Sequence, residues 1–302
     1  MFNYFKKKIS QYRYSLFERN FSELKILAAK KLVYQNNQIQ KIKELGEVEF
    51  NAFSQSGDDG IIQYLINKFG ISNKTFVEFG VENYRESNTR FLLMNNNWSG
   101  LVIDGSKHNI EYIKRDPIYI FFELHAVEAF ITKENINALI GEKFKGNIGL
   151  LSIDIDGNDY WILETITAVN PDILIVEYNA LFGTERAITV PYDEAFVRTQ
   201  KHYSNLYWGA SLKAIVLLAE KKGYVFAGCN NTCNNAYFIK KEIFEKSNCI
   251  DEKVVKQEYV DFKFRQSKNQ EGQLTHLNPA ESYQLIKGMP VVNIITGKEE
   301  EF

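Results

Sequence analysis

The chain has 302 residues, a formal net charge of −2 and a hydrophobic content of 45%. A chain of this length and composition can bury a large core, which excludes a disordered, collagen-like or disulfide-scaffold protein. Its apolar runs fall short of the roughly 18–20 residues that a membrane span requires. The near-neutral charge also argues against a nucleic-acid partner, because dedicated nucleic-acid binders are usually strongly basic.

The charge is divided unevenly between a basic start and an acidic remainder. Residues 1–44 carry ten Lys and Arg and three Glu, a net charge of +7, so the other 258 residues carry −9. Apolar residues recur at helical spacing between Phe17 and Val33, with no Pro or Gly before Gly46, and predict a basic helical N-terminal arm over residues 1–48. Two interpretations stay open: a peripheral contact with an anionic membrane surface, or packing on the body or on a second copy in a homo-oligomer.

The start of the chain and its cysteines indicate the compartment. Residues 1–8 are basic but are not followed by the apolar stretch of a secretory signal. Cys229, Cys233 and Cys249 lack the spacing of a redox pair or of a zinc site. We therefore expect reduced thiols and a cytoplasmic protein, with any peripheral membrane contact at the inner face.

From residue 50 onward, short apolar strands alternate with helical stretches, such as 134–140 and 160–168. This alternation predicts an α/β fold in which a parallel sheet has helices on both faces. The expected strands are 75–80, 101–105, 118–125, 149–154 and 173–177.

The predicted sheet ends differently. A helix over 212–222 precedes two strands, 223–228 and 235–239, which six residues separate. Because so short a connection leaves no room for a crossover helix, the two strands should form an antiparallel hairpin. Residues 49–245 are therefore expected to form one domain, with residues 246–302 as a C-terminal extension packed on it.

Acidic side chains end four of the five parallel strands. Ligands bind at the carboxyl ends of strands in open α/β sheets, so these carboxylates favour a cationic ligand or a metal; the alternative is solvated strand ends. Gly80 is not followed by the further glycines that bind a pyrophosphate. An acid on each of the first two strands instead fits a ligand with an amino-acid end and a ribose, which describes S-adenosylmethionine. The acids are Glu78, Asp104, Asp154 with Asp156, and Glu177.

Seven segments between residues 50 and 245 together resemble the FkbM-like class of S-adenosylmethionine-dependent methyltransferases. The resemblance implies the Rossmann-like fold of class I methyltransferases, with a seven-stranded sheet of order 3-2-1-4-5-7-6 and strand 7 antiparallel, which agrees with the predicted hairpin. One departure concerns Asp156, where many relatives have Glu. The segments are Phe53–Gly60, Phe76–Gly80, Glu86–Thr89, Trp98–Leu101, Ile153–Asp159, Tyr207–Leu212 and Asn234–Phe238.

The resemblance also implies roles for individual residues. Asp104 would hold the ribose, and Gln55 would reach the cofactor from above. The expected reaction is O-methylation of a sugar hydroxyl on a carbohydrate or glycoconjugate acceptor, in surface polysaccharide or glycoconjugate biosynthesis. The other expected cofactor contacts are Glu78 and Gly80 at the methionine part, Gly105 and Ser106 beside the ribose, His125 and Ala126 at the adenine, and Asp154 next to the methyl group.

Methyl transfer to a hydroxyl oxygen needs an aligned nucleophile and a group that accepts its proton. Asp154 and Asp156 are candidate catalytic residues, and His202 is the first candidate base among the histidines. Asp154, Asp156 and Glu177 also offer the oxygen ligands that Mg²⁺ or Mn²⁺ prefers. The competing interpretation is that Asp156 begins a turn that caps the following helix.

Residues 181–197 are an expected wall of the acceptor site, where Arg186 would pair with an anionic group of the acceptor. Two other functions remain open: an NAD-dependent oxidoreductase on a similar sheet, and a non-catalytic binding module that retains the fold. The missing glycines and the terminal hairpin weigh against the oxidoreductase.

Overall fold

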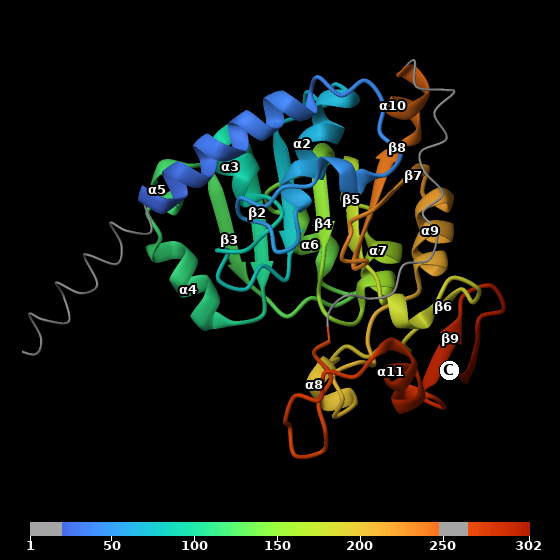
Figure 1. Ribbon diagram of the computed structural model, residues 1–302. Helices are drawn as coiled ribbons and strands as arrows, with labels where there is room; N and C mark the ends of the chain where they lie inside the picture. Colours follow the sequence, from blue (N-terminus) through green and yellow to red (C-terminus); the bar gives the residue numbers. More distant parts are fainter. Residues whose placement is uncertain (1–19, 248–264) are drawn as a thin grey trace, which may run out of the picture.

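The computed structural model describes residues 20–247 and 265–302, and its centre is a seven-stranded sheet (Figure 1). The strands lie in the order β3-β2-β1-β4-β5-β8-β7. Strand β8 runs antiparallel to β5 and to β7, and the other neighbouring pairs are parallel. The strands are β1 (Thr75–Phe79), β2 (Ser99–Asp104), β3 (Leu124–Glu128), β4 (Gly146–Ile153), β5 (Val169–Glu177), β7 (Tyr224–Cys229) and β8 (Asn235–Lys240).

This topology confirms the predicted Rossmann-like sheet of class I methyltransferases. The short strand β6 (Ile188–Thr189) lies outside the large sheet, so β7 and β8 are the sixth and seventh strands of that sheet along the chain. Numbered in this way, the observed order is the expected 3-2-1-4-5-7-6. The antiparallel pairing of β7 with β8 confirms the hairpin that the six-residue connection predicted.

Helices cover both faces of the sheet. On one face α2, α3 and α4 bury apolar side chains against Phe76 and Leu150, and on the other α6, α7 and α9 pack against Val77 and Leu151. Successive side chains of a strand point to opposite faces, so Glu78 lies on the same face as Phe76. The helices are α2 (Asp58–Lys68), α3 (Arg90–Asn96), α4 (Lys107–Arg115), α6 (Ile136–Gly141), α7 (Asp159–Thr165), α9 (Leu212–Lys221) and α10 (Lys241–Lys246).

The strand predicted over 118–125 is wrong in its first half. Residues Ile118–Phe121 form a short helix, α5, and β3 begins only at Leu124. The Asp116 carboxylate accepts the backbone N–H of Ile118 at 3.1 Å, and Pro117 precedes the helix with a fixed φ that suits a first turn. Within the apolar run that suggested a strand, Ile118 is buried but Ile120 and Phe121 are 78% and 75% exposed. The apolar pattern alone did not distinguish a strand from this helix.

A second, smaller sheet was not expected from the sequence. It has the order β10-β9-β6 and lies with α11 beside the carboxyl edge of the large sheet (Figure 1). Phe302 closes its apolar cluster, with its ring centroid 5.1 Å from that of Phe182. The elements here are η2 (Ala180–Phe182), α8 (Arg198–Lys201), α11 (Pro279–Ile286), β9 (Pro290–Asn293) and β10 (Lys298–Glu301).

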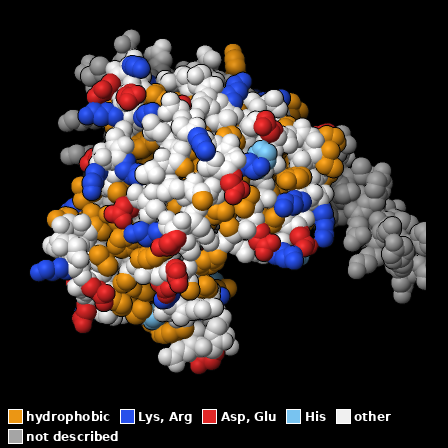
Figure 2. Space-filling view, turned by 180° about the vertical axis from the view of Figure 1, so that it is seen from behind, with side chains coloured by type: hydrophobic (Ala, Val, Ile, Leu, Met, Phe, Trp, Pro, Cys, Tyr) orange, Lys and Arg blue, Asp and Glu red, His pale blue; other side chains and the backbone are white. Residues whose placement is uncertain are grey.

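Residues 20–36 are helical and run across the outside of α3, followed by the short helix η1 (Leu45–Val48) (Figure 1). Ile26, Ala29 and Val33 pack there against Phe53 and Phe91. This part of the predicted arm therefore packs on the body, and residues 1–19 lie outside the described residues. Basic, acidic and apolar side chains are interspersed on the face that Figure 2 shows. No described helix is both long and apolar enough to cross a membrane.

Gly80, at the end of β1, provides the first testable prediction. Its φ is +69°, and a Cβ there would lie 1.6 Å from the carbonyl oxygen of Asp154. Gly80→Ala should lower the free energy of unfolding in urea by about 2–5 kcal/mol, from left-handed strain plus overpacking. Gly70, which follows α2, is the matched control, because its φ is +61° but nothing lies within 4 Å of the added Cβ. Gly70→Ala should cost only about 1–2 kcal/mol; equal losses in the two variants would contradict the contact between the ends of β1 and β4.

Candidate functional site

A cavity of about 400 Å³ opens at the carboxyl ends of β1, β2, β4 and β5. This volume is within the roughly 300–1,000 Å³ of small-molecule sites. The cavity brings together eight of the residues that the sequence singled out: Gln55, Glu78, Gly80, Asp104, Gly105, Asp154, Asp156 and Glu177. The remaining candidates, Ser106, His125, Ala126 and His202, are not among its lining residues.

Asp104 defines one end of the cavity, together with Gly105, Phe130 and Ile131. Its Oδ1 accepts the backbone N–H of Ser106 at 2.8 Å and the Asn109 amide at 3.1 Å. Ser106 is the N-cap of α4, where its hydroxyl accepts the backbone N–H of Asn109, so it supports Asp104 from outside the cavity. A fixed carboxylate beside an aromatic and an aliphatic wall suits a ribose and its base.

His125 and Ala126, which the sequence analysis expected at the adenine, are not among the lining residues of the cavity. Because β3 starts at Leu124, His125 and Ala126 lie near its beginning, where they pair with Leu101 and Val102. The chain that follows β3 reaches the cavity instead, through Ala129, Phe130 and Ile131. Because β3 begins later than expected, residues 129–131 line the cavity in place of His125 and Ala126.

Glu78 is fully engaged within the protein. Its Oε1 accepts the backbone N–H of Asn88 at 2.8 Å, and its Oε2 accepts the N–H of Thr89 at 3.1 Å and the Thr89 hydroxyl. Burial raises the pKa of this carboxyl to about 7 despite these donors. Both oxygens thus fix the loop after β1, and Glu78 shapes the cavity wall instead of offering a free oxygen to a ligand.

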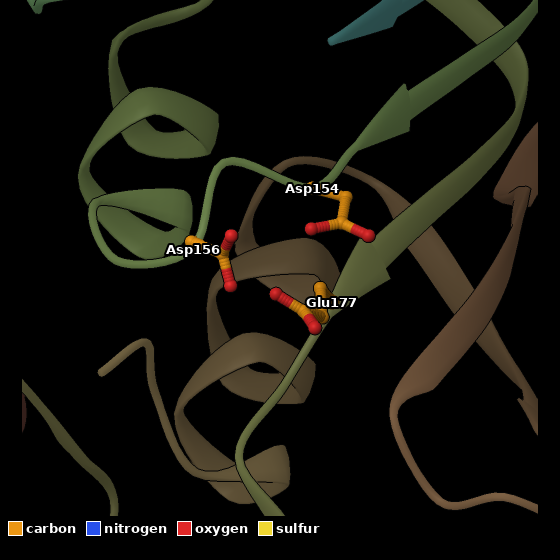
Figure 3. Close-up of side chains that lie close together, drawn as sticks. All are labelled: Asp154, Asp156 and Glu177. Carbon is orange, nitrogen blue, oxygen red and sulfur yellow. The ribbon is translucent and has the colours of Figure 1, made fainter. Parts of the chain in front are cut away.

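Asp154, Asp156 and Glu177 point toward one another at the ends of β4 and β5 (Figure 3). One oxygen of each lies within 4.8 Å of the others. Burial, and then repulsion from neighbouring carboxylates, raises the pKa of Asp154 and of Glu177 well above the ordinary range. Glu177 Oε2 is buried without a hydrogen-bond partner among the described residues. The arrangement can hold a proton between two carboxyl groups or ligate a cation.

The turn after β4 settles how Asp156 is used. Asp159, the first residue of α7, holds this turn, because its carboxylate accepts the N–H groups of Ile155 at 2.9 Å and Gly157 at 3.0 Å. No side chain caps the helix at its N-cap, Asn158. Burial raises the pKa of Asp159 to about 6. Asp156, with a left-handed φ of +56°, lines the cavity.

Arg198 is a site residue that sequence reasoning missed. Its Nη1 donates to Asp156 Oδ1 at 2.6 Å, its Nε donates to the Asn205 carbonyl at 2.9 Å, and its guanidinium lies 4.5 Å from the Trp208 ring centroid. It is the one basic residue among the described residues that line the cavity. The only signal was its place directly after the predicted acceptor wall, 181–197. Trp208 is 2% exposed beneath it, so this ring is buried and is not a platform for a sugar.

His202 and Arg186 are held away from the cavity. The Nδ1 atom of His202 is 2.6 Å from the Ser204 hydroxyl, and burial lowers the pKa of the imidazole. Arg186 pairs with Glu300 at 2.6 Å instead of facing an acceptor. The C-terminal part of the chain contributes Gln266 to the lining, which the sequence did not indicate.

Comparison with known proteins gives likenesses of fold. No family model and no curated protein matches the sequence. The N-terminal domain of EvdMO1 with SAH bound is 11% identical (TM-score 0.40; 62% of this chain and 80% of that chain). A putative caffeoyl-CoA O-methyltransferase from Staphylococcus aureus is 18% identical (TM-score 0.38; 61% and 82%). A SAM dependent methyltransferase from Aquifex aeolicus is 12% identical (TM-score 0.35; 59% and 89%). At such identities the likeness concerns the fold alone, and the function rests on the site.

The buried carboxyl groups predict how stability depends on pH. The pKa is raised by burial to about 6 in Asp59 and Asp159 and to about 7 in Glu78, and it is raised further in the pair Asp154 and Glu177. Since each folded-state pKa exceeds its unfolded value, the folded protein binds more protons between the two, and stability falls as the pH rises through that window. The free energy of unfolding in urea should therefore be higher at about pH 5 than at about pH 8.

Two variants sharpen this measurement. Glu78→Gln removes one titrating group and should reduce the difference between the two pH values. Glu220→Gln, at an exposed position near the end of α9, should leave it unchanged. A wild-type stability that rises from the acidic to the alkaline condition would contradict the protonated state of these groups.

Proposed function

We propose that this chain is an S-adenosylmethionine-dependent O-methyltransferase that acts on a hydroxyl group of a carbohydrate or glycoconjugate. The observation that carries the proposal is that one cavity contains both the Asp104 carboxylate at the end of β2 and the pair Asp154 and Glu177, whose pKa values are raised. Asp104 is placed to bind a ribose, and the pair to accept a proton. The resemblance of the sequence to the FkbM-like class supports the same reaction and supplies its context in surface polysaccharide or glycoconjugate assembly.

The cavity suits the cofactor in shape and in charge. Eight carboxyl groups line it, against the single guanidinium of Arg198, so its field favours a sulfonium cation. The sharp turn at Gly80, where a side chain would clash with the carbonyl of Asp154, lets the backbone approach the cofactor closely. A dinucleotide fits less well, because its pyrophosphate would face carboxylates and would find no glycine-rich turn.

The two carboxyl groups at β4 and β5 carry out the proton transfer. The acceptor oxygen displaces the methyl group from sulfur, so the C–S bond breaks as the O–C bond forms, and sulfur leaves as a neutral thioether. The hydroxyl proton passes to the Asp154–Glu177 pair, whose raised pKa values make it a stronger base than an ordinary carboxylate. Asp156 stays in place through its ion pair with Arg198.

The same three carboxylates fit a hard divalent cation. Their clustered oxygens, and the unpartnered Oε2 of buried Glu177, are the donor set that Mg²⁺ or Mn²⁺ uses. When bound by Asp154, Asp156 and Glu177, such an ion supplies Lewis acidity that lowers the pKa of a ligated hydroxyl.

Polar residues dominate the part of the cavity next to these acids. Asn234, Asn235 and Gln266 are amide residues of the lining. The Asn235 amide already donates to Asp58 and the Asn234 oxygen accepts from Asn230, which leaves the Asn234 nitrogen and Gln266 for an acceptor. Arg198 is already paired with Asp156. Such a lining hydrogen-bonds a neutral polyol better than an aromatic or an anionic acceptor, which favours a sugar.

Ligand binding separates this proposal from the oxidoreductase and from a non-catalytic module. In isothermal titration calorimetry, S-adenosylmethionine and S-adenosylhomocysteine should bind with micromolar affinity, and NAD should not bind. NAD binding, or no binding of either adenosyl ligand up to millimolar concentration, would refute the cofactor assignment.

Glu177→Gln tests the catalytic pair without removing an expected cofactor contact. We expect transfer of labelled methyl groups to glycans from cells that lack the protein to fall by about 10²–10⁴-fold, because the proton acceptor is lost. Affinity for S-adenosylhomocysteine should stay within about threefold. The exposed Glu220 near the end of α9 provides the control Glu220→Gln, expected to retain wild-type turnover.

Chelation tests the metal in the same assay. EDTA should abolish methyl transfer by the wild type, and Mg²⁺ or Mn²⁺ should restore it. Full activity after chelation would exclude a role for the ion and leave the carboxyl pair as the group that activates the hydroxyl. Unchanged turnover in Glu177→Gln would exclude both.

A further inference from the structure

Asp58, at the start of α2, is a buried carboxylate whose two oxygens have different surroundings. Its Oδ1 accepts hydrogen bonds from the amides of Asn230 and Asn235, each at 3.0 Å, and from the Tyr237 hydroxyl. Its Oδ2 is buried and has no hydrogen-bond partner among the described residues. Asp58 is 1% exposed and lines the cavity. A buried acceptor of this kind costs free energy unless a ligand supplies a donor.

The turn that leads into Asp58 offers groups of the opposite kind. Gln55, an exposed residue with an amide side chain, lines the cavity. The next residue, Ser56, is not among the lining residues, but its hydroxyl is also buried without a partner among the described residues. Two residues separate Gln55 from Asp58, and one separates Ser56 from it. The turn 55–58 therefore presents hydrogen-bond donors and an anionic acceptor together, which is what the carboxylate and the ammonium of an α-amino acid require.

The position of this turn in the cavity agrees with such a ligand. Asp104 ends β2, whereas Asp58 is tied to β8 on the far side of β4 and β5, and the cavity continues between them past Gly80 and Asp154. A cofactor with its ribose at Asp104 therefore directs its other end toward α2. Glu78, the residue expected at the methionine part, has both oxygens occupied by the loop after β1.

We propose that the turn 55–58 binds the aminoacyl end of S-adenosylmethionine, with Asp58 Oδ2 accepting from the ammonium and with Ser56 and Gln55 donating to the carboxylate. This inference rests on the proposed function. It assigns the contact with the ammonium to Asp58, which precedes β1, instead of to Glu78.

The test compares ligands with different aminoacyl ends, by calorimetry on the full chain. S-adenosylmethionine carries the ammonium and the carboxylate, and decarboxylated S-adenosylmethionine carries the ammonium alone, both on a sulfonium. S-adenosylhomocysteine carries both groups and 5′-methylthioadenosine carries neither, both on a neutral thioether. Asp58→Asn keeps an oxygen for the three donors and turns only the cavity-facing atom into a donor. It should weaken binding of the three ligands that carry the ammonium by at least about tenfold and leave 5′-methylthioadenosine within about twofold of wild type.

Ser56→Ala provides a second arm. It should weaken binding of S-adenosylmethionine by about three- to tenfold and leave the decarboxylated ligand unchanged. Glu220→Gln on α9 is the charge-matched control and should bind all four ligands as the wild type does. Thermal melting of each variant, with and without 5′-methylthioadenosine, verifies that it is folded.

Wild-type protein alone can overturn the inference, even where Asp58→Asn does not fold. Equal affinity of the wild type for S-adenosylhomocysteine and 5′-methylthioadenosine, which are both neutral thioethers, would show that the aminoacyl end is not recognised, while the proposed function would stand. Equal weakening of all four ligands in Asp58→Asn would also overturn it, because the loss would then be structural. No binding of any of them to the wild type would refute the proposed function itself.

Discussion

The cost of burying a carboxylate governs how this site is built. An ionised acid removed from water needs hydrogen-bond donors or a positive partner. Most buried acids here have them: Asp59 accepts three backbone N–H groups, Glu78 accepts two and Asp159 accepts two. Three carboxylate oxygens, Glu177 Oε2, Asp58 Oδ2 and Asp59 Oδ1, are buried without a partner among the described residues, and of these residues Glu177 and Asp58 line the cavity. The unpartnered oxygens of these two are therefore the ones that a ligand or a proton must complete.

This distinction explains why the sequence predicted the edge of the sheet better than the role of each acid. Alternation of strands and helices, and acids at four strand ends, follow from local patterns and were sufficient for the topology and for the position of the cavity. Whether an oxygen is already occupied depends on contacts that local patterns do not contain. Glu78 is bound by a loop ten residues away, and Asp58 by a hairpin more than 170 residues away.

The error at β3 has the same origin on a smaller scale. Residues 118–122 are apolar and aromatic, which suits a buried strand, yet Asp116 and Pro117 start a helical turn there. Because the predicted strand ended at His125, the prediction placed this residue at the carboxyl end, whereas it lies near the beginning of β3. The sequence did not indicate Arg198 because its role depends on contacts with Asp156, Asn205 and Trp208, and only the tertiary structure brings these residues around it.

The last residues of the described chain act on the same site through packing. Phe302 belongs to the apolar cluster that also contains Trp208 and Val291, and the Tyr207 hydroxyl donates to the Pro290 carbonyl. Trp208 in turn lies against the Arg198 guanidinium, which holds Asp156. The small sheet thus fixes the orientation of one carboxylate in the cavity, and it does so without lining the cavity itself.

The charge of the cavity bears on turnover if it binds S-adenosylmethionine as proposed. Eight lining carboxyl groups and one guanidinium attract a sulfonium, but methyl transfer turns the sulfonium into a neutral thioether. The proton released from the acceptor enters the Asp154–Glu177 pair and reduces the negative charge at the same moment. Both changes weaken the attraction between the cavity and the spent cofactor. The negative charge that the sequence concentrates outside the basic arm would therefore serve the reaction in two ways. It would help to bind the charged cofactor, and it would favour release of the neutral product.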